Sequence, residues 1–502
     1  MALDQSWFDQ MEARIPKGEV RTRFAPSPTG YMHVGNLRTA LYTYLIARHS
    51  GGKFILRIED TDQKRKVEDA VAVIKRTMER CGLDYDEGPD VGGPVGPYVQ
   101  TERRSFYGRY AELLIERGHA YRCFCSEERL EELHRDDPNA KYDRHCLSLT
   151  QEEIEAKLAA GEPYVIRQKI PAGTTTFHDA VYGDITVDNA ELDDQVLIKS
   201  DGLPTYNFAN VVDDHLMGIT HVVRGSEYLS SSPKYNLLYE AFGWPIPTYV
   251  HCAAVQIRDG ETGAVRKMSK RLGDPSYEDL TAMGYLSPAI VNYVALLGWS
   301  PRGDLAEQEF FTMPQLIAAF DIEGISKSPS AFDLEKLTYF NASYLRAMSP
   351  EAFHAAAEPY IRQTVKNPAV STREIAALLQ ARCERLTDIP EKVDFFDALP
   401  SYDVSLYTNK KSKTNEEVSL RMLEAALPAL EALPAWTTDA VHDCLMALAE
   451  TLGVKNATLM WPVRIAAAGK AVTPGGAVEI CHILGRDEVL ARLRRGIELL
   501  KG

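Results

Sequence analysis

The chain has 502 residues, of which 45% are hydrophobic and 25% charged, a composition that excludes a disordered or collagen-like protein. Its length predicts about three domains, at roughly 150 residues per domain. The formal net charge of −15 means that a polyanionic partner would need a local basic surface.

The chain also lacks the marks of a membrane-bound or secreted protein. No apolar run approaches the roughly 20 residues of a membrane-spanning helix. The charged N-terminal segment does not resemble a signal or transit peptide, and eight cysteines are too sparse for a disulfide framework. We therefore expect a soluble, cytoplasmic protein without a membrane partner.

The first 270 residues alternate between strand-like and helix-like patterns, as in an α/β domain. Residues 20–25 predict a strand, residues 36–50 an amphipathic helix capped by Asn36, and residues 53–58 a second strand. A strand, a helix and a strand at this spacing predict a βαβ unit with parallel strands.

The pattern changes twice further along the chain. From about residue 105 to 203, a cysteine-bearing stretch, a charged helix and short strands predict an insertion in the α/β domain. Strand and helix patterns return at residues 205–212 and 221–224. After about residue 280 strand signals fade, and segments rich in Leu, Ala and Glu predict helices with breaks at prolines, among them Pro390, Pro400 and Pro434.

The first turn between strand and helix reads PSPTGYMHVGN (residues 26–36) and places His33 beside a glycine at a helix N-terminus. The free N–H groups at such an end attract phosphates. Alone, such a histidine more often caps or packs than binds a ligand.

Far downstream stands KMSKR (residues 267–271), with three cations within five residues. This pattern suits a clamp on a transferring phosphoryl group. A solvated basic loop is an equally good reading of the pentapeptide alone.

Together, the two motifs resemble the paired signatures of class I aminoacyl-tRNA synthetases. Longer segments resemble the bacterial-type glutamyl-tRNA synthetases: RFAPSPTG (23–30), RIEDTD (57–62), LPTYNFANVVDDH (203–215), residues 333–341 and WPVR (461–464). The chain departs from the superfamily pattern at Asn36, where a histidine is common.

The resemblance implies a Rossmann-like α/β catalytic domain followed by an all-helical anticodon-binding region. We expect the catalytic domain in two halves, residues 1–110 and 205–265, interrupted at 111–204 by an acceptor-binding subdomain with a zinc site. A stem-contact domain bearing the KMSKR segment would span 266–345, and the anticodon-binding domain 346–502.

The implied reaction is ATP-dependent activation of L-glutamate to glutamyl-adenylate, followed by transfer to the 3′ end of tRNA(Glu), in a monomeric enzyme. One alternative is a form that also charges tRNA(Gln). Another is an inactive tRNA-binding paralogue, although the motif residues that such a protein would lose are present. Glutaminyl-tRNA synthetase is related but ends in β-barrels, whereas this C-terminus predicts helices.

The resemblance also implies the binding residues. The residues implied for ATP are His33, Gly35, Asn36, Glu227, Lys267, Met268, Ser269, Lys270 and Arg271. Of these, His33, Lys267 and Lys270 are the implied catalytic residues, and Mg²⁺ is expected to bridge the phosphates of ATP. The glutamate set is Arg23, Ala25, Ser27, Glu59, Tyr206, Asn210 and Arg224.

Within the glutamate set, family position makes Arg23, Tyr206 and Arg224 the carboxylate partners and Glu59 the partner of the amino group. An arginine suits this task because its planar fork meets a carboxylate through two parallel hydrogen bonds. For Arg57, Asp60 and Asp62, a structural ion-pair network is the preferred interpretation.

A zinc site is a further expectation. Cys123, Cys125 and Cys146 supply thiolates suited to tetrahedral zinc, and metal-binding members of the family match at these positions and at Tyr142. His145 or His134 could replace Tyr142, and three reduced cysteines without metal are the alternative.

Two basic runs lie in the helical part, Lys410, Lys411 and Lys413, and Arg492, Arg494 and Arg495. Either is a candidate for tracking tRNA phosphates, although most such runs are solvated faces. We expect Lys410, Lys411, Lys413 and Arg464 to contact tRNA.

Overall fold

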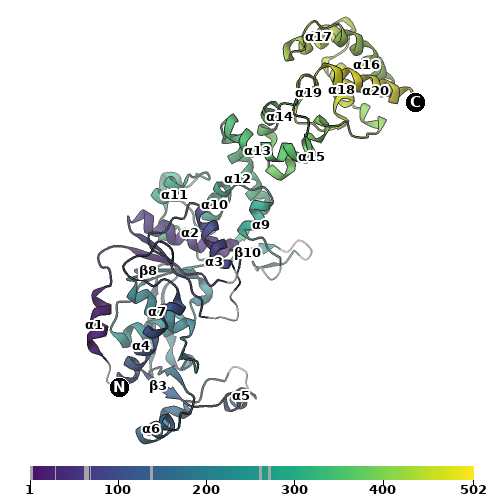
Figure 1. Cartoon of the computed structure of the whole chain (residues 1–502). Helices are drawn as coiled ribbons and strands as arrows, with labels where there is room; N and C mark the ends of the chain where they lie inside the picture. The colour runs from purple at the N-terminus through teal and green to yellow at the C-terminus, as the bar shows by residue number, and fades with distance from the viewer. Residues whose placement is uncertain are drawn as a thin grey trace. The chain divides into compact units, whose positions relative to one another are not determined.

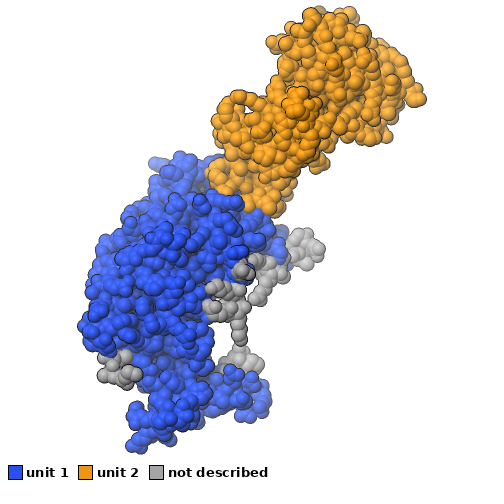
Figure 2. All heavy atoms as spheres, viewed as in Figure 1, with its two compact units in different colours: residues 1–279, 290–333 blue, residues 280–289, 334–502 orange. Residues whose placement is uncertain are grey.

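The computed structural model describes residues 4–28, 30–61, 67, 69–135, 140–258, 263–268 and 273–502 (Figure 1). The chain folds into two compact units (Figure 2). Unit 1 comprises residues Met1–Asp279 and Ile290–Asp333, and unit 2 comprises Leu280–Ala289 and Leu334–Gly502.

Unit 1 begins its main sheet with the predicted βαβ unit, which is confirmed. Strands β1 (Arg21–Phe24) and β2 (Lys53–Leu56) pair in parallel and are joined by α2 (Val34–His49). The helix starts earlier than predicted, because His33 and not Asn36 is its N-cap.

The prediction that this helix is amphipathic is wrong, since most of its side chains are buried. The sheet packs on one side of α2, while on another side Tyr42 donates a hydrogen bond to the carbonyl of Ala295 at 3.0 Å. Arg38 likewise donates to the carbonyl of Leu297 at 3.0 Å. A helix enclosed between two layers has no need of a polar face.

The main sheet has six strands in the order β2-β1-β8-β9-β5-β6. The added strands are β5 (Thr174–Asp179), β6 (Gly183–Asp188), β8 (His221–Gly225) and β9 (Thr248–Cys252). All neighbours pair in parallel except β5 and β6, which form a hairpin within the stretch predicted as an insertion. The carboxyl ends of the parallel strands therefore share one edge, where ligands bind in such folds.

Helices cover this sheet and build the core of unit 1. They include α1 (Gln5–Ala13), α3 (Ala70–Arg80), α4 (Arg104–Glu116), α7 (Tyr206–Leu216) and α8 (Ser232–Phe242). One apolar cluster joins Phe8 of α1, Tyr110 of α4, Phe208 of α7 and Phe242 of α8. This cluster fixes α7 and α8, which carry residues of the site described below.

The cysteine-bearing stretch has a small sheet of its own, β3 (Ala120–Cys123), β4 (Val165–Gln168) and β7 (Val196–Ile198), paired antiparallel. Helices α5 (Glu127–Arg135) and α6 (Gln151–Ala159) accompany it (Figure 1). The charged helix and the short strands predicted here are confirmed. The side chain of His134 lies outside the described part of the chain.

A third sheet contains β10 (Val255–Arg258), β11 (Val265–Lys267) and β12 (Ser330–Phe332). Strand β12 contradicts the expectation that strand structure ends near residue 280. The expectation failed because residues 290–333 fold with unit 1, where β12 pairs in parallel with β10. Helix α11 (Met313–Ala319) belongs to the same segment, and α9 (Tyr277–Ala282) and α10 (Ser287–Ala295) contain residues of both units.

Unit 2, which the structure describes throughout, is helical and confirms the prediction for the C-terminal third. Its helices are α12 (Leu334–Ala347), α13 (Pro350–Thr364), α14 (Thr372–Leu379), α15 (Ile389–Val393), α16 (Glu416–Glu431), α17 (Thr438–Thr451), α18 (Asn456–Ala468), α19 (Ala477–Leu484) and α20 (Arg486–Lys501). Pro390 lies in the first turn of α15, Pro400 follows that helix, and Pro434 follows α16, as predicted. Across the described residues, none of the helices is long and apolar enough to cross a membrane.

Candidate active site

A cavity of about 280 Å³ opens at the carboxyl edge of the main sheet. Most of the predicted ATP and glutamate residues line it: Arg23, Ala25, Ser27, His33, Gly35, Asn36, Glu59, Tyr206, Arg224, Glu227 and Lys267. They come from β1, α2, α7, β8, β11 and the segments between these elements. Residues more than 200 positions apart therefore meet in one place, which supports a single site for both substrates.

Two of the predicted residues that the structure describes stand apart from this lining. Asn210 is buried behind it, and Met268 is buried with its N–H bonded to the carbonyl of Val255 at 3.0 Å. Ser269, Lys270 and Arg271 lie outside the described residues.

The structure adds lining residues that the sequence reasoning missed, notably Arg38 and Tyr228. Arg38 follows Gly35 by three positions on α2, so helical spacing could have placed it on the face of the cavity. Tyr228 directly follows the predicted Glu227, but no pattern in the sequence distinguishes it from a core tyrosine.

His33 has a defined hydrogen-bonding role at the start of α2. Its Nδ1 accepts the backbone N–H of Gly35 at 3.1 Å and that of Asn36 at 3.3 Å. Because Nδ1 accepts, the ring proton of a neutral His33 sits on Nε2. His33 thus accepts two of the backbone N–H groups at the start of α2 through Nδ1, and its own N–H donor is on the other ring nitrogen, Nε2.

Behind the cavity lies a buried network of ion pairs centred on Asp214. Arg23 meets both oxygens of Asp214, at 2.9 and 3.2 Å, and Arg57 donates to Oδ1 at 2.7 Å. Burial alone would raise the pKa of Asp214, but the charges of Arg23 and Arg57 lower it to about 2. Asp214 is therefore ionised at neutral pH and holds both arginines in place.

Arg57 also holds Glu59, with Nη2 2.8 Å from Oε1. Burial raises the pKa of Glu59, and the charge of Arg57 opposes that rise. The structural role expected for Arg57 is confirmed, since it is fully buried between Asp214 and Glu59. Asp60 accepts from the N–H and hydroxyl of Thr101, and Asp62 lies outside the described residues.

Arg224 has hydrogen-bonding capacity to spare in this site. Nη2 donates to Oδ1 of Asn210 at 3.3 Å, but the buried Nε and Nη1 have no acceptor among the described residues. The guanidinium lies between the rings of Tyr228 and Tyr235, at 5.2 and 5.1 Å from their centroids. Buried N–H groups are costly to leave unpaired, so this geometry points to an anionic ligand.

The formal charges agree with that conclusion. Arg23, Arg57 and Arg224 supply three positive charges, and Asp214 and Glu59 supply two negative ones. This network keeps one positive charge in excess, and Arg38 in the wall of the cavity adds another, so the site favours an anionic ligand.

Asn210 and Tyr206 shape the Arg224 side of the cavity. Asn210 donates to the carbonyl of Tyr206 at 2.8 Å while accepting from Arg224, so it holds the arginine instead of facing the cavity. The Tyr206 ring lies 5.7 Å from that of Tyr228. Burial raises the pKa of Tyr206 well above its ordinary value, which keeps its hydroxyl protonated as a donor.

At the rim of the cavity, Lys267 at the end of β11 lies 3.4 Å from the carboxylate of Glu227. Both side chains are more than half exposed, so the pair contributes little to stability. A weak exposed pair can be exchanged at little cost for contacts with a phosphate.

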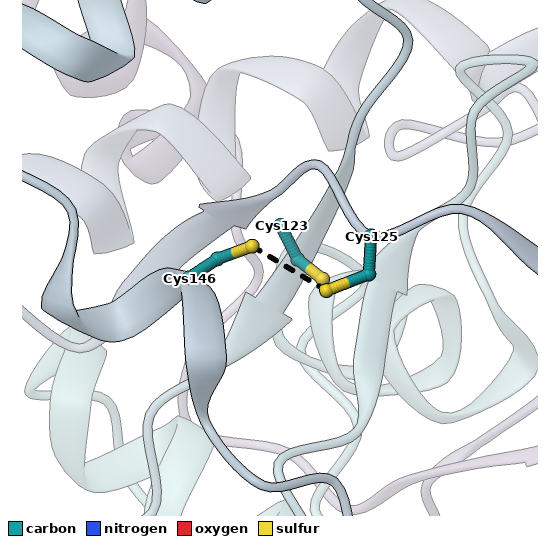
Figure 3. A group of neighbouring side chains, drawn as sticks. All are labelled: Cys123, Cys125 and Cys146. Carbon is teal, nitrogen blue, oxygen red and sulfur yellow. Dashed lines mark hydrogen bonds between the residues drawn. The ribbon is translucent and has the colours of Figure 1, made fainter. Parts of the chain in front are cut away.

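The three cysteines predicted to bind zinc come together in the small sheet region (Figure 3). Their sulfur atoms all lie within 4.8 Å of one another, and those of Cys125 and Cys146 are 3.5 Å apart. The hydroxyl of Tyr142 lies 3.3 Å from the sulfur of Cys123 and 3.4 Å from that of Cys125. Among the described side chains, no histidine nitrogen joins this group, which leaves His145 outside it.

This cluster has the chemistry of a tetrahedral zinc site. Four donors at about 2.0–2.3 Å from a common centre would be separated by distances of the order seen here. The pKa of Cys123 is lowered despite its burial, through Tyr142 and Arg167, whereas burial raises the pKa of Cys125 to about 11. The second thiol needs a cation to ionise at neutral pH, which zinc would supply.

In unit 2, a second cavity of about 300 Å³ is lined by Arg382, Ser412, Trp461 and Arg464. The Arg464 guanidinium lies 4.6 Å from the centre of the Trp461 ring, and burial together with Arg382 lowers its pKa. Neither arginine has a carboxylate at ion-pair distance in the part of the chain that is described.

The lysine run borders the same cavity. Lys410, Lys411 and Lys413 are exposed on a turn closed by a bridge between residues 409 and 414, and Ser412 of this turn lines the cavity. The structure thereby brings all four predicted tRNA residues to one region of unit 2.

Only part of the second basic run lies at the surface, since Arg494 and Arg495 are exposed and Arg492 is not. Arg492 is buried and donates to the carbonyls of Phe395 and Ala467, at 2.8 and 2.6 Å, while Arg494 pairs with Glu431. Arg492 points inward because it lies on the face of α20 that packs against the core of unit 2. The spacing of the three arginines in the sequence did not reveal which face this is.

Comparison with known proteins places these features in a family. A family model described as the catalytic domain of class I tRNA synthetases (E and Q) matches residues 19–339, and an anticodon-binding domain model matches residues 352–497. The glutamate–tRNA ligase of Clostridium botulinum (strain Hall) is 58% identical over 488 residues, covering 96% of this chain and 99% of the relative. That of Clostridium acetobutylicum is 56% identical with the same coverage.

Solved structures agree with this result. The chain superposes on a glutamate tRNA ligase from Elizabethkingia meningosepticum, in complex with its amino acid, with a TM-score of 0.87 and 34% identity, covering 96% of this chain and 100% of the other. A glutamate–tRNA synthetase from Elizabethkingia anophelis has a TM-score of 0.86 with the same identity and coverage. The chain therefore belongs to the class I aminoacyl-tRNA synthetases, within the family of the bacterial glutamate–tRNA ligases.

Proposed function

We propose that this chain joins L-glutamate to tRNA(Glu) in two ATP-dependent steps, as a glutamate–tRNA ligase. The observation that carries this proposal is the guanidinium of Arg224, with two buried nitrogens lacking acceptors among the described residues, beside a network of ion pairs with one positive charge in excess. A side-chain carboxylate can accept hydrogen bonds along one edge of the guanidinium and neutralise its charge, whereas an uncharged amide does neither fully.

Glutamate would lie between two groups of opposite charge. Arg224, Arg23 and Tyr206 would bind the carboxylates of glutamate. Oε2 of Glu59, the oxygen that does not meet Arg57, would bind the ammonium group. Ala25 and Ser27, which line the same cavity, would contact the backbone of the substrate. Asn210 would act through Arg224, since its own amide is already engaged.

In the first step, an oxygen of the α-carboxylate attacks the α-phosphorus of ATP, forming glutamyl-adenylate and releasing pyrophosphate. A hydroxyl of the terminal tRNA ribose then attacks the carbonyl carbon, and AMP leaves. Both nucleophiles belong to the substrates, so the enzyme contributes positioning and electrostatic stabilisation.

Several side chains would bind ATP. The Nε2–H of His33 would donate to a phosphate oxygen, and Lys267 would exchange Glu227 for the phosphates. Lys270, with Met268, Ser269 and Arg271, would complete the ATP set. Gly35, which has no Cβ, would let the backbone of α2 approach the nucleotide, and Asn36 would line the same side. Mg²⁺ bound to ATP supplies further neutralisation of the phosphate charge.

We further propose that Cys123, Cys125, Cys146 and Tyr142 hold one structural Zn²⁺. The mutual distances of these donors and the raised pKa of Cys125 support this assignment. All four positions are filled by protein atoms, so the metal would stabilise the inserted subdomain and take no part in chemistry.

For tRNA, Lys410, Lys411 and Lys413 would track phosphates, and Arg464 would face the nucleotides at the cavity of unit 2. The two family models end at 339 and begin at 352, which supports a boundary between stem-contact and anticodon-binding domains near residue 346. We retain the other predicted boundaries (1–110, 111–204, 205–265 and 266–345), and propose that the protein acts as a monomer in the cytoplasm.

The proposal is tested by release of pyrophosphate in the presence of ATP and tRNA(Glu), with glutamate, glutamine or aspartate as the amino acid. Release that depends on glutamate, with glutamine at least about 10²-fold less efficient in kcat/KM, is the expected result. Equal use of glutamine and glutamate would contradict the role given to Arg224.

A further inference from the structure

A serine, a histidine and an aspartate form a continuous hydrogen-bonded chain behind the active site. Asp179 ends β5, His251 lies in β9 and Ser232 begins α8. Oδ2 of Asp179 accepts from Nδ1 of His251 at 2.6 Å, and Nε2 of His251 lies 3.4 Å from the hydroxyl of Ser232. These are the residue types and the order of a hydrolytic triad.

The burial of the three residues excludes that role. Asp179, His251 and Ser232 are each 0% exposed, so no substrate can reach the serine hydroxyl. The hydroxyl is also engaged, since it lies 3.0 Å from the carbonyl of Tyr228, closer than it lies to His251. The single hydroxyl proton of Ser232 is shared between the carbonyl of Tyr228 at 3.0 Å and the unprotonated Nε2 of His251 at 3.4 Å, so the serine is a buried donor and not a nucleophile.

Each end of the chain is anchored. The second oxygen of Asp179 accepts the N–H groups of Val181 and Tyr182 at 3.0 and 2.8 Å, and Oδ2 also accepts the N–H of His251 at 3.1 Å. Burial lowers the pKa of His251 more than Asp179 raises it, so the ring is neutral, with its proton on Nδ1 toward the carboxylate.

The other end of the chain reaches the amino acid pocket. Tyr228 closes a short 3₁₀ turn (Ser226–Tyr228), lines the cavity, and lies with its ring 5.2 Å from the guanidinium of Arg224. The second ring against Arg224 belongs to Tyr235, three residues after Ser232 on α8. Helix α8 thus carries one of the two rings beside Arg224, and its first residue bonds the backbone of the tyrosine that carries the other.

We propose that Asp179, His251 and Ser232 are positioning residues that tie α8 and Tyr228 to the main sheet and so hold Arg224 in the orientation that binds glutamate. This inference depends on the proposed role of Arg224. A guanidinium held between two fixed rings loses less conformational freedom when it meets a carboxylate, which strengthens binding.

The test compares Ser232→Ala with wild type by aminoacylation, with KM measured separately for glutamate, ATP and tRNA. We expect the KM for glutamate to rise at least fivefold while the KM values for ATP and tRNA stay within twofold. Ser232→Thr, which keeps the hydroxyl, should restore the KM for glutamate to within twofold of wild type. Ser230→Ala is the matched control, because Ser230 is exposed on the same segment and its hydroxyl meets the carbonyl of Glu227 at 3.4 Å.

Ser232→Cys covers the case in which the alanine variant does not fold, because a thiol preserves most of the volume but is a weak donor. It should raise the KM for glutamate at least threefold. Unchanged glutamate KM in the folded Ser232 variants, or an equal rise for all three substrates, would overturn the positioning role. A wild-type enzyme that fails to charge tRNA with glutamate would instead overturn the proposed function on which the inference rests.

Discussion

Replacing Arg224 by glutamine tests the residue to which we assign the recognition of the glutamate carboxylate. The change removes the positive charge that the ion pairs around Asp214 leave unbalanced, and it leaves Arg23 and Arg57 paired with Asp214. Glutamine is uncharged and shorter, so it cannot replace both N–H groups that now lack acceptors.

The size of the effect follows from those two groups. Each hydrogen bond to a charged group is worth about 1.5–3 kcal/mol, so the loss of two amounts to roughly 3–6 kcal/mol of binding to the substrate carboxylate. This corresponds to a fall of about 10²- to 10⁴-fold in kcat/KM for glutamate. The kcat/KM for glutamine should change far less, because its amide never had the charge-assisted bonds, and discrimination between the two amino acids should narrow.

The assay is steady-state aminoacylation of one tRNA transcript with each amino acid, accompanied by a thermal unfolding curve to establish that the variant is folded. Arg135→Gln is the control, since Arg135 is exposed and pairs only with Glu132 among the described residues. A folded Arg224→Gln variant with wild-type kcat/KM for glutamate and an unchanged ratio to glutamine would refute the assignment.

Three further predictions concern the metal, the ion pairs and the phosphates. Cys146→Ser should reduce the bound zinc from about one per chain to near zero by elemental analysis, and Cys444→Ser should not; full zinc in the first variant would contradict the site. Although burial raises the pKa of Asp214, Arg23 and Arg57 lower it to about 2. The stability that the ionised Asp214 contributes is therefore fully present above the pKa of the unfolded state and is lost as the pH falls toward 2. In urea unfolding measured from about pH 5 downward, the free energy of unfolding of the wild type should therefore fall by about 2 kcal/mol more than that of Asp214→Asn. An identical fall in both proteins would contradict the role of Asp214. Lys270→Ala should slow adenylate formation about 10²- to 10³-fold with tRNA affinity unchanged, and a wild-type rate would remove this lysine from the mechanism.

Much of the site could be predicted because its residues lie in short local patterns. The turn that carries His33 and the strand that carries Arg23 are continuous in sequence, so their meeting at one edge of the sheet follows from a βαβ unit. The zinc candidates likewise lie within 24 residues, and their sulfur atoms all lie within 4.8 Å of one another.

What could not be predicted depends on contacts between distant segments. His251 and Asp179 are 72 residues apart and meet only because β5 and β9 are neighbours in the sheet. The burial of Arg492 depends on how α20 packs, and the cap at His33 depends on an imidazole replacing the more usual side-chain oxygen. Tyr228 became part of the site through the orientation of its ring against Arg224, which no spacing in the sequence encodes.

The central claim is tested most directly by aminoacylation with radiolabelled glutamate and ATP, using separate transcripts of tRNA(Glu) and tRNA(Gln). We expect ATP-dependent attachment of glutamate to tRNA(Glu), and the second transcript shows whether the enzyme is discriminating or also charges tRNA(Gln). Absence of glutamate attachment to either transcript, by a folded protein that still binds tRNA, would contradict the assignment as a glutamate–tRNA ligase.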